Sequence, residues 1–166
     1  MLRSAFVALY LIGSCTLGYA DCAPGKEIWA GSSDRAKVVA YYPDGISSTS
    51  NIVFEGWEGA RIEWRVRATV ECSNGIVICG LSIPTVDGRF IETADAEEVG
   101  SGSKRYLVFA SLQQTTAREQ MYGANPVAIA AEWFVKKPID PPAIVLPSKY
   151  RLVGCQKGDE LEAGSK

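Results

Sequence analysis

The chemistry open to this chain is limited first by a residue type that it lacks. None of the 166 residues is histidine, which excludes Ser-His-Asp and Cys-His catalytic groups, histidine-ligated metals and the usual side-chain switch near neutral pH. An enzyme built on this sequence would need a carboxylate pair, a Ser-Lys pair, or tyrosine and arginine side chains. The sequence shows no phosphate-binding loop, dinucleotide fingerprint or calcium loop. We therefore expect a protein that is not an enzyme and that holds no cofactor.

One pair of carboxylates flanks an aromatic residue, in the segment Glu55-Gly56-Trp57-Glu58. A glycosidase needs two carboxyl groups about 5–10 Å apart beside a surface on which a sugar can stack. The surrounding glycines predict a turn, where exposed glutamates are ordinary. We therefore predict no catalytic residue. A histidine-free hydrolase of envelope glycans that uses Glu55 or Glu58 is an alternative hypothesis.

Aromatic and arginine side chains are better candidates for function, because tryptophan, tyrosine and arginine dominate the energetics of protein interfaces. The predicted binding residues are Trp57, Tyr41, Arg61, Arg65 and Arg67. Trp57 would either anchor a partner or a sugar, or fold back over the end of the domain. The three arginines would either contact an acidic partner or form weak cross-strand pairs on a solvated sheet face. The second interpretation predicts that Arg65→Ala costs little stability.

Four cysteines follow the first 20 residues: Cys22, Cys72, Cys79 and Cys155. An even set predicts disulfides in an oxidising compartment. A zinc site could use only the four thiolates, because the sequence has no CxxC pair and no histidine, and we expect no bound metal. Cys22 and Cys155 lie near the two ends of the predicted domain, which are often close together in space.

The other two cysteines flank a predicted β-hairpin. Asn74-Gly75 is the strongest short signal for a two-residue turn, and such a turn would leave Cys72 and Cys79 as diagonal neighbours on one face. Diagonal neighbours lie somewhat too far apart for a disulfide unless a bulge or strong twist brings them together. We predict the pairs Cys72–Cys79 and Cys22–Cys155. The alternative pairing links each terminal cysteine to one cysteine of the hairpin.

Residues 1–20 carry the pattern of a cleavable secretory signal. One positive charge at Arg3 is followed by an uncharged apolar run at 5–12 and by small residues before Asp21. The run is shorter than the ~20 apolar residues that cross a bilayer, so we predict a periplasmic or secreted protein. Cys15 leaves an alternative open, because Ile12-Gly13-Ser14-Cys15 resembles the motif before the lipidated cysteine of bacterial lipoproteins. Lipidation would anchor the protein in the envelope membrane.

The elements that would position these residues are mostly short strands. Apolar and polar residues alternate over 60–72, which predicts a strand with one dry face and one charged face. Further strands are predicted at 36–42, 51–55, 76–83, 88–93, 104–112, 127–135 and 149–155. Residues 113–122 are a candidate short helix. Asn125-Pro126 could also begin a helix over 127–135, but Trp133-Phe134-Val135 favours the strand. Residues 156–166 have the composition of a disordered tail. We expect a mainly β fold, an antiparallel β-sandwich or barrel-like single domain over 21–155 with at most one short helix.

Charge narrows the choice of partner. The formal net charge is −2 and no basic stripe stands out, which argues against nucleic acid. Our leading hypothesis is an exported non-catalytic binding or interaction domain of the cell envelope or periplasm, with an inhibitor or immunity-type protein as one form of it. Its partner would be another protein or an envelope glycan, and it would contact a membrane only if Cys15 is lipidated. A structural subunit of a surface assembly is the second alternative.

Overall fold

The computed structural model describes residues 22–32, 37–72, 79–93, 96–135 and 142–156. They form ten strands, the helix α1 (Leu112–Met121) and one turn of 3-10 helix at Gly102–Lys104. The strands are β1 (Glu27–Ser32), β2 (Lys37–Tyr41), β3 (Thr49–Glu58), β4 (Arg61–Cys72), β5 (Cys79–Pro84), β6 (Phe90–Thr93), β7 (Ala96–Val99), β8 (Tyr106–Phe109), β9 (Glu132–Trp133) and β10 (Lys149–Cys155). In the described segments no helix is both long enough and apolar enough to cross a membrane.

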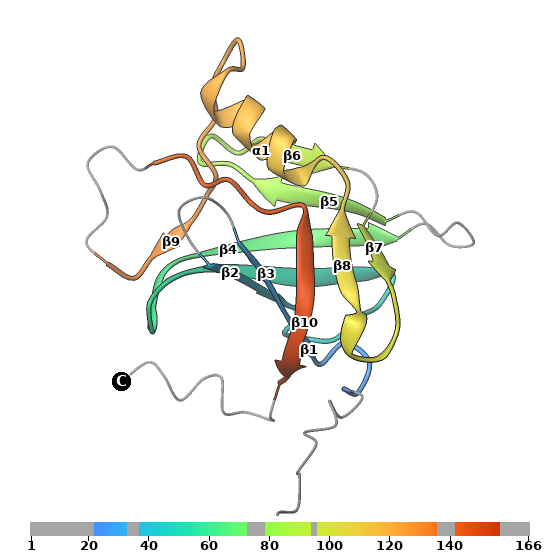
Figure 1. Ribbon diagram of the computed structural model, residues 1–166. Coiled ribbons are helices and arrows are strands. Elements are labelled where there is room, and N and C mark those ends of the chain that lie inside the picture. The colour runs from blue at the N-terminus through green and yellow to red at the C-terminus, as the bar shows by residue number, and fades with distance from the viewer. Residues whose placement is uncertain (1–21, 33–36, 73–78, 94–95, 136–141, 157–166) are drawn as a thin grey trace, which may run out of the picture.

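The strands form one antiparallel sheet in the order β6-β5-β4-β3-β2-β1-β10-β8-β7, with β9 paired to β4. The two ends of this order, β6 and β7, follow one another in the chain. Because only two residues separate Thr93 from Ala96, their Cα atoms lie no more than about 11 Å apart, and β7 also contacts β5. The sheet therefore curls into a half-barrel (Figure 1). Of the two expected architectures, the barrel-like one is confirmed, with a single short α-helix.

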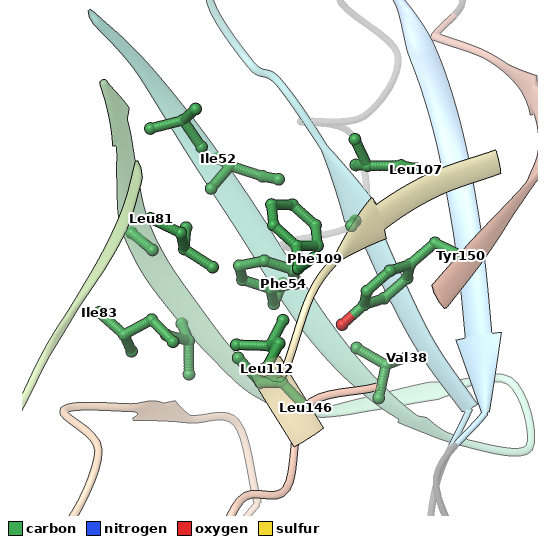
Figure 2. Close-up of a cluster of buried hydrophobic side chains, with 14 of the residues drawn as sticks. Val38, Ile52, Phe54, Leu81, Ile83, Leu107, Phe109, Leu112, Leu146 and Tyr150 are labelled. Carbon is green, nitrogen blue, oxygen red and sulfur yellow. The ribbon is translucent and has the colours of Figure 1, made fainter. Parts of the chain in front are cut away.

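The core fills the concave side of this sheet. Phe54, Phe109 and Tyr150 meet at its centre with ring centroids 5.8 to 6.0 Å apart. Aliphatic side chains from the surrounding strands pack against them, as Figure 2 shows for Val38, Ile52, Leu81, Ile83 and Leu107. The interior is thus packed with side chains, and most of the stability must come from the burial of this apolar surface.

The hairpin of β3 and β4 confirms the alternation at 60–72. Trp64, Val66, Ala68 and Val70 are buried on the inner face of β4. The turn expected around residues 55–59 is wrong, because β3 continues to Glu58 and the turn consists of Gly59, with a φ of +60°, and Ala60. Gly56 is a glycine for a different reason. The indole of Trp64 lies against it, and a Cβ at that position would overlap the ring.

One end of the half-barrel is covered by α1, which confirms the predicted helix within one residue at each boundary. Leu112 of α1 and Leu146, in the segment before β10, are both fully buried. Thr116 joins these two segments, since its hydroxyl donates to the Leu112 carbonyl and accepts from the Leu146 amide. The strand expected at 127–135 is only partly formed, as β9 and as a single bridge between Ile129 and Thr85.

Both predicted disulfides, Cys22–Cys155 and Cys72–Cys79, are present. The expected hairpin register is wrong, however. Cys72 lies directly opposite Cys79, not diagonal to it, so six residues connect the two strands where a two-residue turn was predicted. The predicted turn at Asn74-Gly75 itself lies outside the described residues, as do the signal at 1–20, Cys15 and nearly all of the tail at 156–166.

Candidate binding site on the outer face of the sheet

The register of β2, β3 and β4 brings polar residues together on the convex side, away from the core. Tyr41, Val53 and Arg67 form one cross-strand row. Val39, Glu55 and Arg65 form the next row. Because side chains alternate along a strand, these residues point opposite to the buried Val38, Ala40, Ile52 and Phe54. Two of the predicted arginines and the predicted tyrosine therefore share one surface.

A single carboxylate oxygen is the centre of this surface. Oε1 of Glu55 accepts hydrogen bonds from the Tyr41 hydroxyl at 3.1 Å and from Nε of Arg65 at 2.9 Å, while Nη2 of Arg65 lies 2.8 Å away. The other side of the same guanidinium faces Glu132 of β9, with Nη1 3.9 Å from Oε2. We call Tyr41, Glu55, Arg65 and Glu132 the outer-face cluster.

Burial makes these contacts strong. The Glu55 side chain is only 5% exposed and that of Arg65 is 21% exposed, although both lie on the side of the sheet that faces away from the core. The pKa of Tyr41 is raised to about 12, mainly because burial disfavours the phenolate and next because the neighbouring Glu55 carboxylate repels it. For Arg65, burial alone would lower the pKa, but the hydrogen bond and charge of Glu55 outweigh it and the pKa rises. The tyrosine thus stays neutral and the arginine stays charged at every physiological pH.

Other side chains complete the surface. The Arg65 guanidinium lies 4.9 Å from the centre of the Phe134 ring, a cation–π contact. Arg67 is exposed and has no ion pair within the described residues. Trp57 is half-buried in β3 on the same face, opposite Lys37, and its indole N–H has no partner in the part of the chain that the structure describes.

The remaining predicted binding residue lies apart. Arg61 sits at the tip of the β3–β4 hairpin, where its exposed guanidinium approaches Glu58 at 3.5 Å. The structure therefore brings Tyr41, Arg65 and Arg67 together, places Trp57 beside them and leaves Arg61 outside. Sequence reasoning did not identify Glu132 and Phe134 as part of this surface, because they join it only through the pairing of β9 with β4.

The two glutamates of the alternative hydrolase hypothesis are not brought together. Three residues apart in one strand, Glu55 and Glu58 project to opposite faces. Glu55 is buried and paired with Arg65, whereas the Glu58 side chain is 71% exposed and lies beside Arg61. No group of three or more potential metal ligands occurs among the residues that the structure describes.

A second cluster of charges was missed at the sequence level. At the end of the half-barrel opposite α1, Arg105 bonds Glu27 of β1 at 3.0 Å and Glu98 of β7 at 2.5 Å. Its guanidinium also lies 5.6 Å from the Trp29 ring. We call Glu27, Glu98 and Arg105 the inner cluster. The one available signal was Glu27 itself, a lone acid directly before the apolar Ile28-Trp29-Ala30.

Comparisons of this chain with models of known protein families, with curated proteins and with solved structures give no match. Its own residues are therefore the basis on which a function can be argued.

Proposed function

We propose that this chain is an exported, non-catalytic binding domain that holds a protein partner against the outer face of β2, β3 and β4. One observation carries the proposal. On a sheet face that is directed away from the core, Val53 is 1% exposed and Glu55 is 3% exposed. An ordinary solvated face would leave both in water, so these side chains are covered by an ordered layer of polar and aromatic groups.

That layer is suited to binding because it is held in place before a partner arrives. Three contacts to Glu55 fix Tyr41 and the Arg65 guanidinium, and Phe134 stacks on the latter. Ordering a long side chain on binding costs about 0.5–1.5 kcal/mol. A surface that is already ordered avoids much of this cost. Arg67 on the same face is exposed and has no ion pair among the described residues, so its charge is available to pair with a partner.

The charges favour a protein over a polyanion as the partner. Exposed Lys37 and Arg67 carry positive charge, but exposed Glu71 and Glu132 carry negative charge on the same surface. Nucleic acids and other polyanions require clustered positive charge, whereas protein interfaces match charges of both signs. The aromatic residues Tyr41 and Phe134 add the type of contact that dominates protein interfaces.

Export completes the proposal. Two disulfides favour an oxidising compartment, and the signal pattern at 1–20 supports secretion or a periplasmic location. A surface assembly built through a free sheet end has less support, because the ends of the sheet, β6 and β7, approach each other.

A site-specific cross-linking experiment in the native host tests this function. A photo-reactive amino acid replaces Arg67 in one variant and Arg151 in another. Arg151 is a matched control because it is also an exposed strand arginine without an ion pair in the described residues, on β10. We expect a discrete adduct with one envelope protein from position 67 and none from position 151, identified by mass spectrometry.

Substitution then measures the contribution of the surface. Arg67→Glu should reduce co-purification of that protein at least tenfold, and Arg151→Glu should leave it unchanged. Equal adducts from both positions, or no adduct from either while both variants stay folded in the envelope fraction, would contradict the proposal.

A further inference from the structure

A second surface lies beside α1. A groove with a volume of about 320 Å³ runs between residues 127–133, the C-terminal part of α1 and residues 142–144. We call residues 127–133 the strap and residues 142–146 the return segment. The groove is lined mainly by apolar side chains, among them Val127, Ile129, Trp133 and Ile144.

The strap is bound to the sheet along one side only. The Ala128 carbonyl accepts from the Val86 amide at 2.9 Å, and the Ala130 amide donates to the Pro84 carbonyl at 2.9 Å. In extended chain, the backbone groups of successive residues point to opposite sides. Those of Ile129 and Ala131 therefore point away from the sheet, and neither residue makes a backbone hydrogen bond on that side within the described residues.

The return segment has the same arrangement on the other side of the groove. The Gln120 side chain of α1 accepts from the Ile144 amide at 3.0 Å and donates to the Ile144 carbonyl at 2.8 Å. This satisfies the edge of the return segment that faces the helix. Ala143 and Val145 face the opposite way, and their backbone groups have no hydrogen bond in the part of the chain described. Two extended segments thus flank an apolar groove. On the strap the Val127 amide donates to the Glu119 carbonyl of α1 at 3.0 Å, and within the described residues the backbone groups of Ile129 and Ala131, and those of Ala143 and Val145 across the groove, have no partner.

The described residues that line the groove include no charged side chain. Val86, one of the exposed large hydrophobic side chains, lines the groove. Met121 and Tyr122, which are also exposed, directly follow the lining residue Gln120 in the chain. The charged residues nearest in sequence to Val86 and Gln120 are paired with each other, as Asp87 with Arg89 at 2.7 Å and Arg118 with Glu119 at 2.7 Å. Exposed apolar side chains beside a groove are typical of an interaction site, and a described lining without charged side chains favours an uncharged occupant.

We propose that this groove binds an extended, uncharged peptide segment of a partner protein, which adds as a strand to the free edge of the strap. Its main chain pairs with the backbone groups of Ile129 and Ala131, and its alternate apolar side chains fill the groove. Strand addition to an open edge is an established mode of peptide recognition, in which the main chain gives affinity and the pockets give specificity. The strap contributes Glu132 to the outer-face cluster, but the inference uses the backbone groups of Ile129 and Ala131 and does not depend on that cluster.

Peptide titration followed by NMR tests the proposal on the folded, disulfide-bonded protein. The probes are blocked heptapeptides in which valine, leucine, isoleucine or phenylalanine alternates with threonine. At least one should bind saturably, shift the amide signals of Ile129 and Ala131 and slow their hydrogen exchange at least tenfold. The control peptides, with lysine or glutamate at the apolar positions, should not bind.

Two matched variants separate the groove from the remaining surface. Ala143→Trp fills the groove and should weaken peptide binding at least tenfold. Ala110→Trp changes an exposed alanine before α1 and should bind as the unchanged protein does. The proposal is overturned if no apolar peptide shifts these amides, if charged peptides bind equally well, or if Ala143→Trp keeps full affinity. It is also overturned if the same amides shift with protein concentration alone, which would show that a second copy occupies the groove.

Discussion

The outer-face cluster and the inner cluster are built from the same kinds of residue but lie on opposite faces of the sheet. Each holds an arginine between a buried and a more exposed glutamate: Glu55 and Glu132 around Arg65, Glu27 and Glu98 around Arg105. In each, the arginine also lies over an aromatic ring. The adjacent residues Tyr41 and Tyr42 point to opposite faces, so that each cluster has one tyrosine nearby.

The clusters differ in what they connect. Arg65 and Glu55 are ten residues apart in one hairpin, whereas Arg105 and Glu27 are 78 residues apart. The inner cluster joins β1 to β7, two strands that are not neighbours in the sheet, and it therefore helps to close the half-barrel. The outer cluster joins strands that are already paired. The same chemistry thus serves the fold in one place and is free to serve a partner in the other.

Removal of the inner arginine should have the largest effect. Arg105→Met leaves the Glu27 carboxylate, whose side chain is 4% exposed, without its counter-charge. Loss of one partner of a buried pair typically destabilises a protein by about 3–5 kcal/mol. Urea unfolding with intact disulfides measures this loss in the free energy of unfolding. The control variant Arg151→Met should differ from the unchanged protein by no more than about 0.5 kcal/mol. Adding Glu27→Gln to Arg105→Met should restore part of the loss; a further loss in the double variant would show that the carboxylate is not the cause.

Removal of the outer arginine should cost less. Arg65→Met leaves Glu55 with only its hydrogen bond to Tyr41, and a polar group left unsatisfied in this way costs about 1–3 kcal/mol. This revises the expectation that Arg65 is an ordinary exposed residue whose loss is nearly neutral. The same urea experiment, with Arg67→Met as the matched control, decides between the two. If Arg65→Met destabilised the protein more than Arg105→Met does, the assignment of a structural role to the inner cluster and a binding role to the outer-face cluster would be reversed.

Alkaline pH should weaken both clusters through their tyrosines. Tyr41 and Tyr42 have pKa values of about 12 in the folded protein against 10.0 for the free side chain, in both cases mainly because burial disfavours the phenolate. The folded state binds these protons more tightly, so this stabilisation is complete below pH 10 and is lost between about pH 10 and 12. For the well-buried Tyr42 the loss should approach about 2 kcal/mol.

The phenylalanine variants separate the two tyrosines. Tyr42→Phe should remove more of the stability loss between pH 9 and pH 11.5 than Tyr41→Phe, since Tyr41 is more exposed and solvent screens its surroundings. Equal unfolding curves for the unchanged protein and for Tyr42→Phe across this range would refute the burial argument.

The exposed glutamates should show the smallest effect. Glu132 is 56% exposed and lies 3.9 Å from Arg65, so Glu132→Gln should change stability by less than about 0.5 kcal/mol. Glu98 is 39% exposed with a 2.5 Å contact, and Glu98→Gln should cost about 0.5–1 kcal/mol. Repeating both measurements in 1 M NaCl should reduce the effect of Glu132 to near zero. If Glu132→Gln destabilised the protein more than Glu98→Gln, the inner cluster would no longer be the one that contributes more to stability.

Local patterns in the sequence were sufficient for several elements. The alternation at 60–72 predicted both faces of β4, and the cysteine positions predicted both disulfides. The hairpin register failed because Asn74-Gly75 is a purely local signal, while the pairing of Cys72 with Cys79 is set by the disulfide and by the sheet. The strands β1 and β7 were missed because neither EIWAGS nor AEEV shows a clear alternation of apolar and polar residues, and only pairing with other strands makes them recognisable.

The outer-face cluster shows the same limit. Tyr41, Arg65 and Arg67 were chosen for their residue types, which the sequence displays. Glu55 was assigned to a turn because Gly56 looked like a chain breaker, and only the contact with Trp64 explains that glycine. Nothing local relates Glu132 or Phe134 to β4. Contacts that depend on strand pairing across about 70 residues are not encoded in any short window of sequence.

The disulfide between Cys22 and Cys155 also determines how the domain responds to mechanical force. It links positions 133 residues apart: Cys22 lies five residues before β1, and Cys155 is the last residue of the neighbouring strand β10. Tension applied along the chain on either side of the domain would pass from one cysteine to the other through a single covalent bond. The strands between them would carry no load, and the domain would keep its full shape under a pull that extends its flanking segments.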